Sequence, residues 1–143
     1  MPSKYYAIEA GDGFIKRALG QAAVTSTGYV GNQWDQGGAV FTDFACIINI
    51  EACKISAANE IYTFRVVGSN LANRSDAQIL DTVQVGVAAT ITIETRNTAA
   101  GDQIILEGRT EKNDTAFRFI DLHLTVGGTS PSITFGAYLA RRN

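Results

Sequence analysis

The only histidine of the chain, His123, is the first residue to weigh as a catalytic group, because imidazole often serves as a general base. It lies in the run "AFRFIDLHLTV", where the flanking residues Ile120, Leu122 and Leu124 share the other strand parity. His123 is therefore predicted to be a half-exposed strand residue beside Asp121. A general base also needs a positioned partner and a pocket, and the sequence shows no such set. We expect no catalytic residue and no enzymatic activity.

Metal chemistry is the second possibility, but the ligand types of a zinc site are scarce. One histidine and two separated cysteines disfavour a dedicated site with nitrogen and sulfur ligands. Cys46 and Cys53 lie around a predicted strand, about 23 Å apart if extended, so both are expected to be free thiols. A turn near Glu51 would instead allow a short-loop disulfide. The segment "EAGDGF" lacks the spaced oxygen ligands of a calcium loop and is interpreted as a flexible turn. We expect no metal and no cofactor.

A single domain must position these residues, since 143 residues can bury roughly two-thirds of the unfolded surface. With 18% charged and 45% hydrophobic residues, the composition is that of a folded chain. The formal net charge is −2 and the basic residues are scattered, so no nucleic-acid partner is expected. No apolar stretch approaches the roughly 18 residues of a membrane span, and no apolar signal core is visible. We therefore expect no membrane partner and intracellular synthesis.

Alternating apolar residues predict eight or nine strands along most of the chain. The segments that carry this pattern are "AAVTSTGYV", "GAVFT", "FACIINI", "EIYTFRVVGS", "ILDTVQV", "ATITIETRN" and "QIILEG". Segments rich in Gly, Asn and Asp separate them, including "GNQWDQGG", which we interpret as a loop. We expect an all-β fold, an antiparallel β-sandwich built as a jelly roll of about eight strands with an N-terminal arm.

The last two strands are predicted to pair as a hairpin across the turn "GGTSPS". One parity of each strand is apolar and is expected to face the core: Ile120, Leu122, Leu124 and Val126, followed by Ile133, Phe135, Ala137 and Leu139. His123 then falls on the opposite face.

Residues 1–20 are predicted to be an arm that precedes a sandwich domain of residues 21–143. The arm has no sustained period, yet it contains five large apolar residues: Tyr5, Tyr6, Ile8, Phe14 and Ile15. Disordered segments are usually poor in such residues, so we expect the arm to order on a neighbouring subunit. The alternative is that it folds back and covers an open edge or the base of its own sandwich.

Several segments together resemble the jelly-roll cement (decoration) proteins that coat the capsids of tailed bacteriophages. They are "AAVTSTGYVG", "YTFRVVGSNLANRSDAQIL", "GDQIILEGRT" and "FRFIDLHLTVGGTSPSITFGAYLARR", within Ala22 to Arg141. The resemblance implies a protein that is not an enzyme, forms a homotrimer, and sits on the virion surface where major capsid subunits meet. Its expected partners are the major capsid protein and further copies of itself. We assign as candidate interface residues Tyr5, Tyr6, Ile8, Phe14, Ile15, Trp34, Phe117 and Phe119.

Three function classes are therefore compared. The first is a structural capsid cement protein, which gains affinity by bridging several shell subunits. The second is a carbohydrate-binding β-sandwich module on a virion surface, in which Trp34 would stack on a sugar unless it packs on its own domain. The third, a sandwich hydrolase, is the least favoured because histidine and paired carboxylates are scarce. A trimer would cover the apolar residues of the second strand parity, namely Ala45, Ile47, Phe117 and Phe119.

Overall fold

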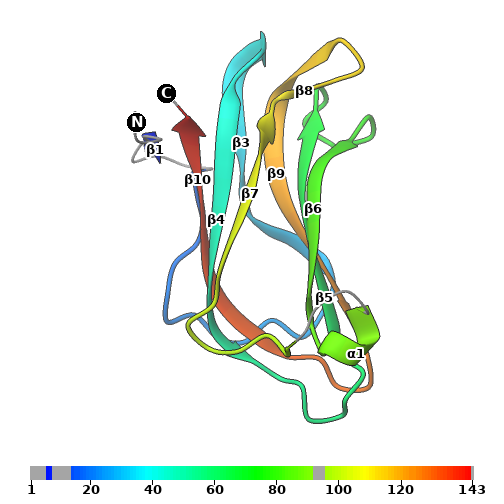
Figure 1. The fold of residues 1–143 in the computed structure, drawn as a ribbon. Coiled ribbons are helices and arrows are strands. Elements are labelled where there is room, and N and C mark those ends of the chain that lie inside the picture. The colour runs from blue at the N-terminus through cyan, green and yellow to red at the C-terminus, as the bar shows by residue number, and fades with distance from the viewer. Residues whose placement is uncertain (1–5, 8–13, 92–95, 143) are drawn as a thin grey trace.

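The computed structural model describes residues 6–7, 14–91 and 96–142. Within these residues the chain is nearly all strand, and two antiparallel sheets face each other as a sandwich (Figure 1). This confirms the predicted all-β sandwich. The elements are β1 (Tyr6–Ala7), β2 (Ile15–Arg17), β3 (Gly28–Val40), β4 (Asp43–Cys53), β5 (Ile61–Ser69), β6 (Gln78–Gly86), α1 (Ala88–Ile91), β7 (Gln103–Arg109), β8 (Glu111–Lys112), β9 (Thr115–Gly127) and β10 (Ile133–Arg142).

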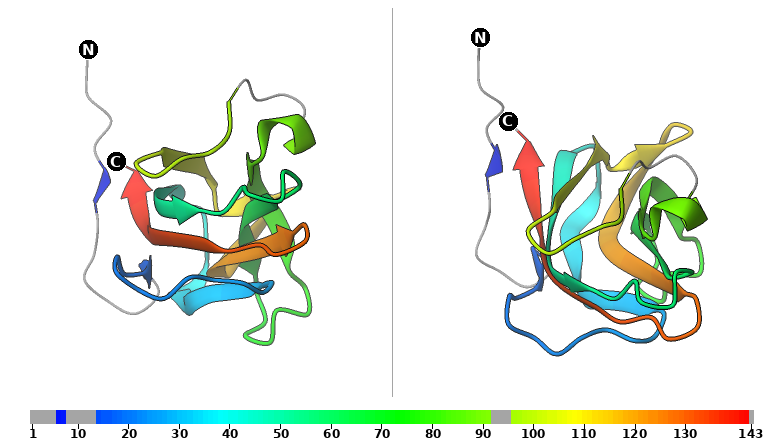
Figure 2. Two further views of the ribbon diagram at one scale, coloured as in Figure 1. Left: turned by 90° about the horizontal axis from the view of Figure 1, so that it is seen from below. Right: turned by 60° about the horizontal axis from the view of Figure 1, so that its bottom comes forward.

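The order of the strands in the two sheets is that of a jelly roll. Sheet A has the order β1-β10-β4-β7, with β2 also pairing with β10, and sheet B has the order β3-β9-β5-β6, with β8 pairing with β9. The short strands β1 and β8 lie outside this pattern. Among the other eight strands, consecutive strands alternate between the two sheets, and the single exception is the pair β5 and β6, which both belong to sheet B. Eight strands connected in this way form the predicted jelly roll. Figure 2 shows β1 alongside the end of β10.

The predicted hairpin of the last two strands is wrong. Strand β9 pairs with β3 and β5 in sheet B, whereas β10 pairs with strands of sheet A. Their connection crosses between the sheets at Gly128, where φ is 106° and an added Cβ would lie 2.8 Å from Glu60 Cα. The apolar parity of both strands is nevertheless buried as predicted, because the two faces meet from opposite sheets.

Two further segments differ from the prediction. The segment "GNQWDQGG" is part of β3, whose register with β9 shifts twice, and it contains Gly31 and Gly37 with φ of 70° and 80°. Glycine is favoured at such irregular positions, which explains why the segment has the composition of a loop.

The segment "ATITIETRN" was predicted to be a strand. Its beginning lies in helix α1, and residues 92–95 lie outside the described residues. The amide of Ile91 donates to the carbonyl of Val87. Helix α1 has four residues, and no described helix is long and apolar enough to cross a membrane.

The inner faces of both sheets meet in one hydrophobic core. Phe64 of β5 and Phe135 of β10 pack edge to face, with ring centroids 5.0 Å apart. Tyr62 is fully buried, and its hydroxyl donates to the Lys54 carbonyl at 2.8 Å and accepts from the Ser132 amide at 2.9 Å. The phenol therefore ties the segment after β4 to the segment before β10.

The sandwich begins earlier than the predicted boundary after residue 20. Strand β2 pairs with β10, and the amide of Leu139 donates to the carbonyl of Phe14 at 2.7 Å. Phe14 is 4% exposed and packs on Trp34 with ring centroids 4.6 Å apart. Residues 14–17 therefore cover an edge of their own sandwich, which corrects the arm for this part. Residues 1–5 and 8–13 of the predicted arm lie outside the described residues.

The apolar residues that suggested a trimer are mostly covered within the single chain. Ala45 is 0% exposed, Ile47 is 6% exposed and Phe117 is 2% exposed. Phe119 is half-buried. Their burial removes this sequence argument for the homotrimer, which stays a prediction based on the resemblance.

Truncating Phe14 tests whether the start of the chain belongs to the core. Replacement by alanine is expected to lower the free energy of unfolding by about 3 to 4 kcal/mol, because the cavity beside Trp34 would not refill. Urea denaturation followed by circular dichroism measures the change. The control is Phe41→Ala, since Phe41 is 60% exposed and its loss should cost less than about 0.5 kcal/mol. Equal effects of the two substitutions would contradict the assignment of Phe14 to the core.

Candidate functional site

Three of the predicted interface residues are core residues. Phe14 and Trp34 pack on each other, and Trp34 is only 7% exposed. The Phe117 ring lies against Gly68, where an added Cβ would be 2.6 Å from Phe117 Cδ2. None of these three side chains is free to contact a partner, and the Trp34 indole cannot stack on a sugar. The alternative interpretation of Trp34, packing within its own domain, is confirmed.

The other predicted interface residues are distributed over the molecule. Ile15 is 56% exposed on the outer face of sheet A. Phe119 lies on the outer face of sheet B beneath the Arg118 guanidinium, which is 4.9 Å from its ring centroid. Tyr6 pairs through its backbone with Arg142. Tyr5 and Ile8 lie outside the described residues. The structure therefore does not gather the predicted set into one surface.

His123 lies on the outer face of sheet B, on the opposite parity to the core, as predicted. The Tyr29 ring meets the imidazole edge to face at a centroid distance of 4.9 Å, and Arg65 is its cross-strand partner on β5. Burial, with a smaller contribution from the charge of Arg65, lowers the pKa of His123 below its ordinary value. The imidazole is therefore largely neutral at pH 7. The nearby carboxylate of Asp121 binds Arg74 and Gln33 instead, so this pair is not a catalytic dyad.

Asp121 anchors the loop between β5 and β6 to sheet B. Its carboxylate is almost fully buried and accepts two hydrogen bonds from Arg74, at 2.9 and 3.0 Å, and one from Gln33 at 2.9 Å. The Arg74 guanidinium also covers the Tyr29 ring, with Cζ 4.1 Å from the centroid. Bidentate pairing of this kind fixes geometry as well as charge. One face of the Tyr29 ring is consequently occupied by Arg74.

Lys16 is a buried cation that links the two sheets. Its Nζ donates to the carbonyl oxygens of Asn32, at 2.6 Å, and Ile120, at 3.1 Å, both in sheet B, while its own strand β2 belongs to sheet A. Burial lowers the pKa of Lys16 to about 8, although the charge of Asp121 opposes this effect. The ammonium group is thus mostly charged at pH 7, and its desolvation costs stability.

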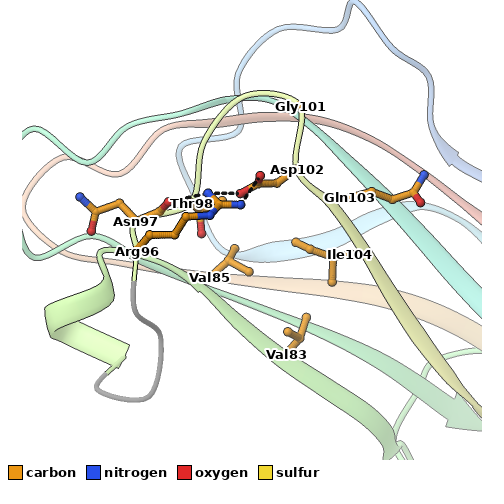
Figure 3. Close-up of a pocket in the computed structure, with 9 residues that line it drawn as sticks. All are labelled: Val83, Val85, Arg96, Asn97, Thr98, Gly101, Asp102, Gln103 and Ile104. Carbon is orange, nitrogen blue, oxygen red and sulfur yellow. Dashed lines mark hydrogen bonds and ion pairs between the residues drawn. The ribbon is translucent and has the colours of Figure 1, made fainter.

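A cavity of about 380 Å³ lies between β6 and β7 (Figure 3). Val83, Val85 and Ile104 point into it, and the Arg96 guanidinium pairs with Asp102 at 2.7 Å on its rim. The charge of the guanidinium is therefore matched. Among the lining residues described there is no histidine, cysteine or serine. The two lining groups that could act as a base or a nucleophile have other partners: the Asp102 carboxylate accepts from Arg96, and the Thr98 hydroxyl accepts from the Gly86 amide.

The thiols and the acidic residues offer no metal centre in the described part of the chain. Cys46 and Cys53 are free thiols, as predicted, and burial raises their pKa values to about 12 and about 11. No cluster of three or more His, Cys, Asp or Glu side chains suited to a metal ion occurs among residues 14–91 and 96–142.

The outer faces of the two sheets each carry a row of cross-strand neighbours with a distinct chemistry. On sheet A the row is apolar and runs across four strands: Ile15, Tyr138, Ile47 and Ile105. On sheet B the row is polar and aromatic: Tyr29, His123, Arg65 and Thr82. We call them the sheet A row and the sheet B row. The sequence pattern identified His123, Ile15 and Ile47 as outward-facing residues, but it did not show which residues are their neighbours on adjacent strands.

Comparison with known proteins gives only distant matches. No protein-family model and no curated protein sequence matches the chain. One similar solved structure contains the N-terminal CBM22-1–GH10 modules of endo-1,4-β-D-xylanase 10B from Clostridium thermocellum, complexed with xylohexaose. Its identity is 12% and its TM-score 0.41, over 100% of this chain and 29% of that chain. Another, a xylan-binding module CBM15, has 12% identity and a TM-score of 0.43, over 97% of this chain and 95% of that chain. Similarity at this level transfers no ligand to this chain.

The buried charge of Lys16 predicts a specific pH dependence of stability. Its pKa is about 8 in the folded protein and about 10.5 when unfolded, so the unfolded chain binds more protons between these values. Stability should therefore rise with pH in this window, by about 2 kcal/mol from Lys16 between pH 7 and pH 9.5. The measurement is urea denaturation of the wild type and of Lys16→Met at both pH values. The wild type should gain this increment relative to the variant, and parallel pH profiles would contradict the assignment.

Proposed function

We propose that this chain is a structural virion protein, a cement (decoration) protein that binds the outer surface of a phage head and clamps neighbouring major capsid subunits. The observation that carries the proposal is the apolar sheet A row, which spans the outer face of a rigid sandwich. Ile15 is 56% exposed and Ile105 46% exposed at its two ends, and Leu19 adds a further 62% exposed side chain over Gly136. Between these ends Tyr138 is half-buried and Ile47 is buried, so the exposed apolar area lies at Ile15 and Leu19 on one side and at Ile105 on the other. Exposed apolar side chains gathered on one face mark protein interaction surfaces.

The shape and the rigidity of this surface also support a role in binding capsid subunits. Beside the row, a shallow cavity of about 290 Å³ is lined mainly by apolar atoms of Ile15, Leu19, Gly136 and Tyr138. Strands β2, β10, β4 and β7 hold the row in place by backbone hydrogen bonds, so docking requires little ordering. A rigid surface of modest size reaches high affinity when several copies bind one shell at once.

The segments that resemble phage cement proteins supply the second support, and they include the cross-sheet connection between β9 and β10. The alternative, a carbohydrate-binding module, loses the tryptophan that the sequence analysis assigned to sugar stacking. Trp34 is buried, and one face of Tyr29 is covered by Arg74. A hydrolase is likewise disfavoured, since the neighbouring Asp121 carboxylate binds Arg74 rather than His123.

Shell binding tests the proposal directly. Purified protein should co-sediment with empty shells assembled from the major capsid protein of the same virus and should bind no sugar on a glycan array that includes xylan fragments. Ile105→Glu places a charge in the sheet A row and is expected to weaken shell binding about tenfold or more. Leu71→Glu is the matched control, because Leu71 is 50% exposed on the loop between β5 and β6. Glycan binding without shell binding would favour the carbohydrate-binding module instead.

The proposal includes a homotrimer, which follows from the resemblance to cement proteins. Light scattering after size exclusion should give three times the chain mass of 15.3 kDa at micromolar concentration. A monomer mass both in solution and after release from shells would contradict the trimer.

A further inference from the structure

The sheet B row forms one wall of a shallow cup on the molecular face opposite to the sheet A row. The cup has a volume of about 270 Å³ and is lined by Tyr29, Arg65, Val67, Ile79 and His123, together with Ala77 and Gln78. Strands β3, β9, β5 and β6 each contribute lining residues. The cup therefore rests on four hydrogen-bonded strands, with Ala77 alone coming from the loop before β6.

The guanidinium of Arg65 in this cup has no counterion among the residues that the structure describes. Three arginines lie over the outer face of sheet B, and two have carboxylate partners: Arg74 with Asp121 at 2.9 Å, and Arg118 with Asp35 at 2.8 Å. Arg65 donates to the Thr125 hydroxyl at 2.9 Å. Within residues 14–91 and 96–142 no carboxylate forms an ion pair with Arg65. Most of the N–H donors of this half-buried guanidinium therefore have no acceptor in the described part of the chain.

The neighbours of Arg65 favour a singly charged anion. His123 is its cross-strand partner and is largely neutral at pH 7, so the positive charge of the cup comes from Arg65 alone. Asp121 lies in the adjacent cross-strand position, opposite Val67, and its negative charge is already shared with Arg74. A phosphate dianion would meet one unmatched cation and a nearby carboxylate, whereas a carboxylate matches the guanidinium in charge and in its planar geometry.

The rim of the cup is apolar. Tyr29 is 42% exposed and Ile79 is 43% exposed, while Val67 forms the nearly buried floor. Apolar side chains beside the guanidinium lower the local dielectric constant and so strengthen its attraction for an anion that covers the cup. They also offer contact area to an apolar residue next to that anion.

We propose that this cup binds the carboxylate of an Asp or Glu side chain, flanked by an apolar residue, on the surface of a partner protein. The identity of that partner as the major capsid subunit rests on the proposed function, whereas the carboxylate chemistry does not. The protein then contacts its surroundings through two opposite faces: an apolar one on sheet A, and a charge-specific one on sheet B.

A peptide titration tests the carboxylate chemistry without any shell. The probes are the capped peptide acetyl-Gly-Phe-Glu-Gly-amide and its counterpart with Gln in place of Glu, added to isotope-labelled protein and followed by NMR. The Glu peptide should shift the Arg65 Nε–H and His123 ring signals saturably, and the Gln peptide should bind about fivefold more weakly. Arg65→Gln should remove the difference between the peptides, and Arg65→Lys should retain part of it. Arg96→Gln is the matched control, since Arg96 is an exposed arginine of the segment before β7 and is paired with Asp102.

The second arm of the experiment assigns the partner. Arg65→Gln and Arg96→Gln are compared with the wild type in shell co-sedimentation, after their amide spectra have confirmed a native fold. A loss of about fivefold or more for Arg65→Gln alone supports the capsid subunit as the partner. Peptide binding without any wild-type shell binding would keep the carboxylate site and refute the proposed function. Equal binding of both peptides, or unchanged signals at Arg65 and His123, would overturn the site itself.

Discussion

The fold depends on the burial of one apolar face from each sheet in a single shared core. Phe64 and Phe135 meet there from opposite sheets, and the buried Tyr62 closes one end through hydrogen bonds to the backbone. Because side chains alternate along each strand, burying one parity sends the other parity outward at fixed positions. The two outer rows are therefore consequences of the core. A strand that slipped by one residue would disrupt both the core and the exposed surface.

Two buried charged side chains hold parts of the sandwich together through hydrogen bonds. The ammonium group of Lys16 crosses from sheet A to two carbonyl groups of sheet B, and Asp121 holds Arg74 and its loop against the outside of sheet B. Burying such charged groups lowers stability, because they lose their hydration. It also favours one arrangement of the strands, because their hydrogen bonds form only in that arrangement. On the outer face of sheet B, Arg74 and Arg118 each pair with a carboxylate. Arg65 is half-buried on the same face and has no acidic partner in the described chain.

Sequence patterns predicted the faces of the strands better than their partners. The outward position of His123 and the burial of its neighbours followed from alternation, and the free thiols followed from the extended chain between Cys46 and Cys53. Alternation carries no information about which strand lies alongside, so β9 and β10 were paired with each other although they belong to opposite sheets. The glycine-rich part of β3 was predicted to be a loop, because its register with β9 shifts and its side chains do not alternate regularly. Lys16 and Arg65 gave no local signal, because their roles arise only from contacts with residues distant in sequence.

The proposed clamp unites these features: a rigid jelly roll presents an apolar surface on one face and an unpaired cation on the other, without groups arranged for catalysis in the described residues. Electron cryomicroscopy of empty shells incubated with the purified protein tests this account most directly. We predict additional density of jelly-roll shape above the junctions between major capsid subunits, with the outer face of sheet A against the shell. Bare shells at saturating protein, or bound density in which neither sheet face contacts a capsid subunit, would contradict it.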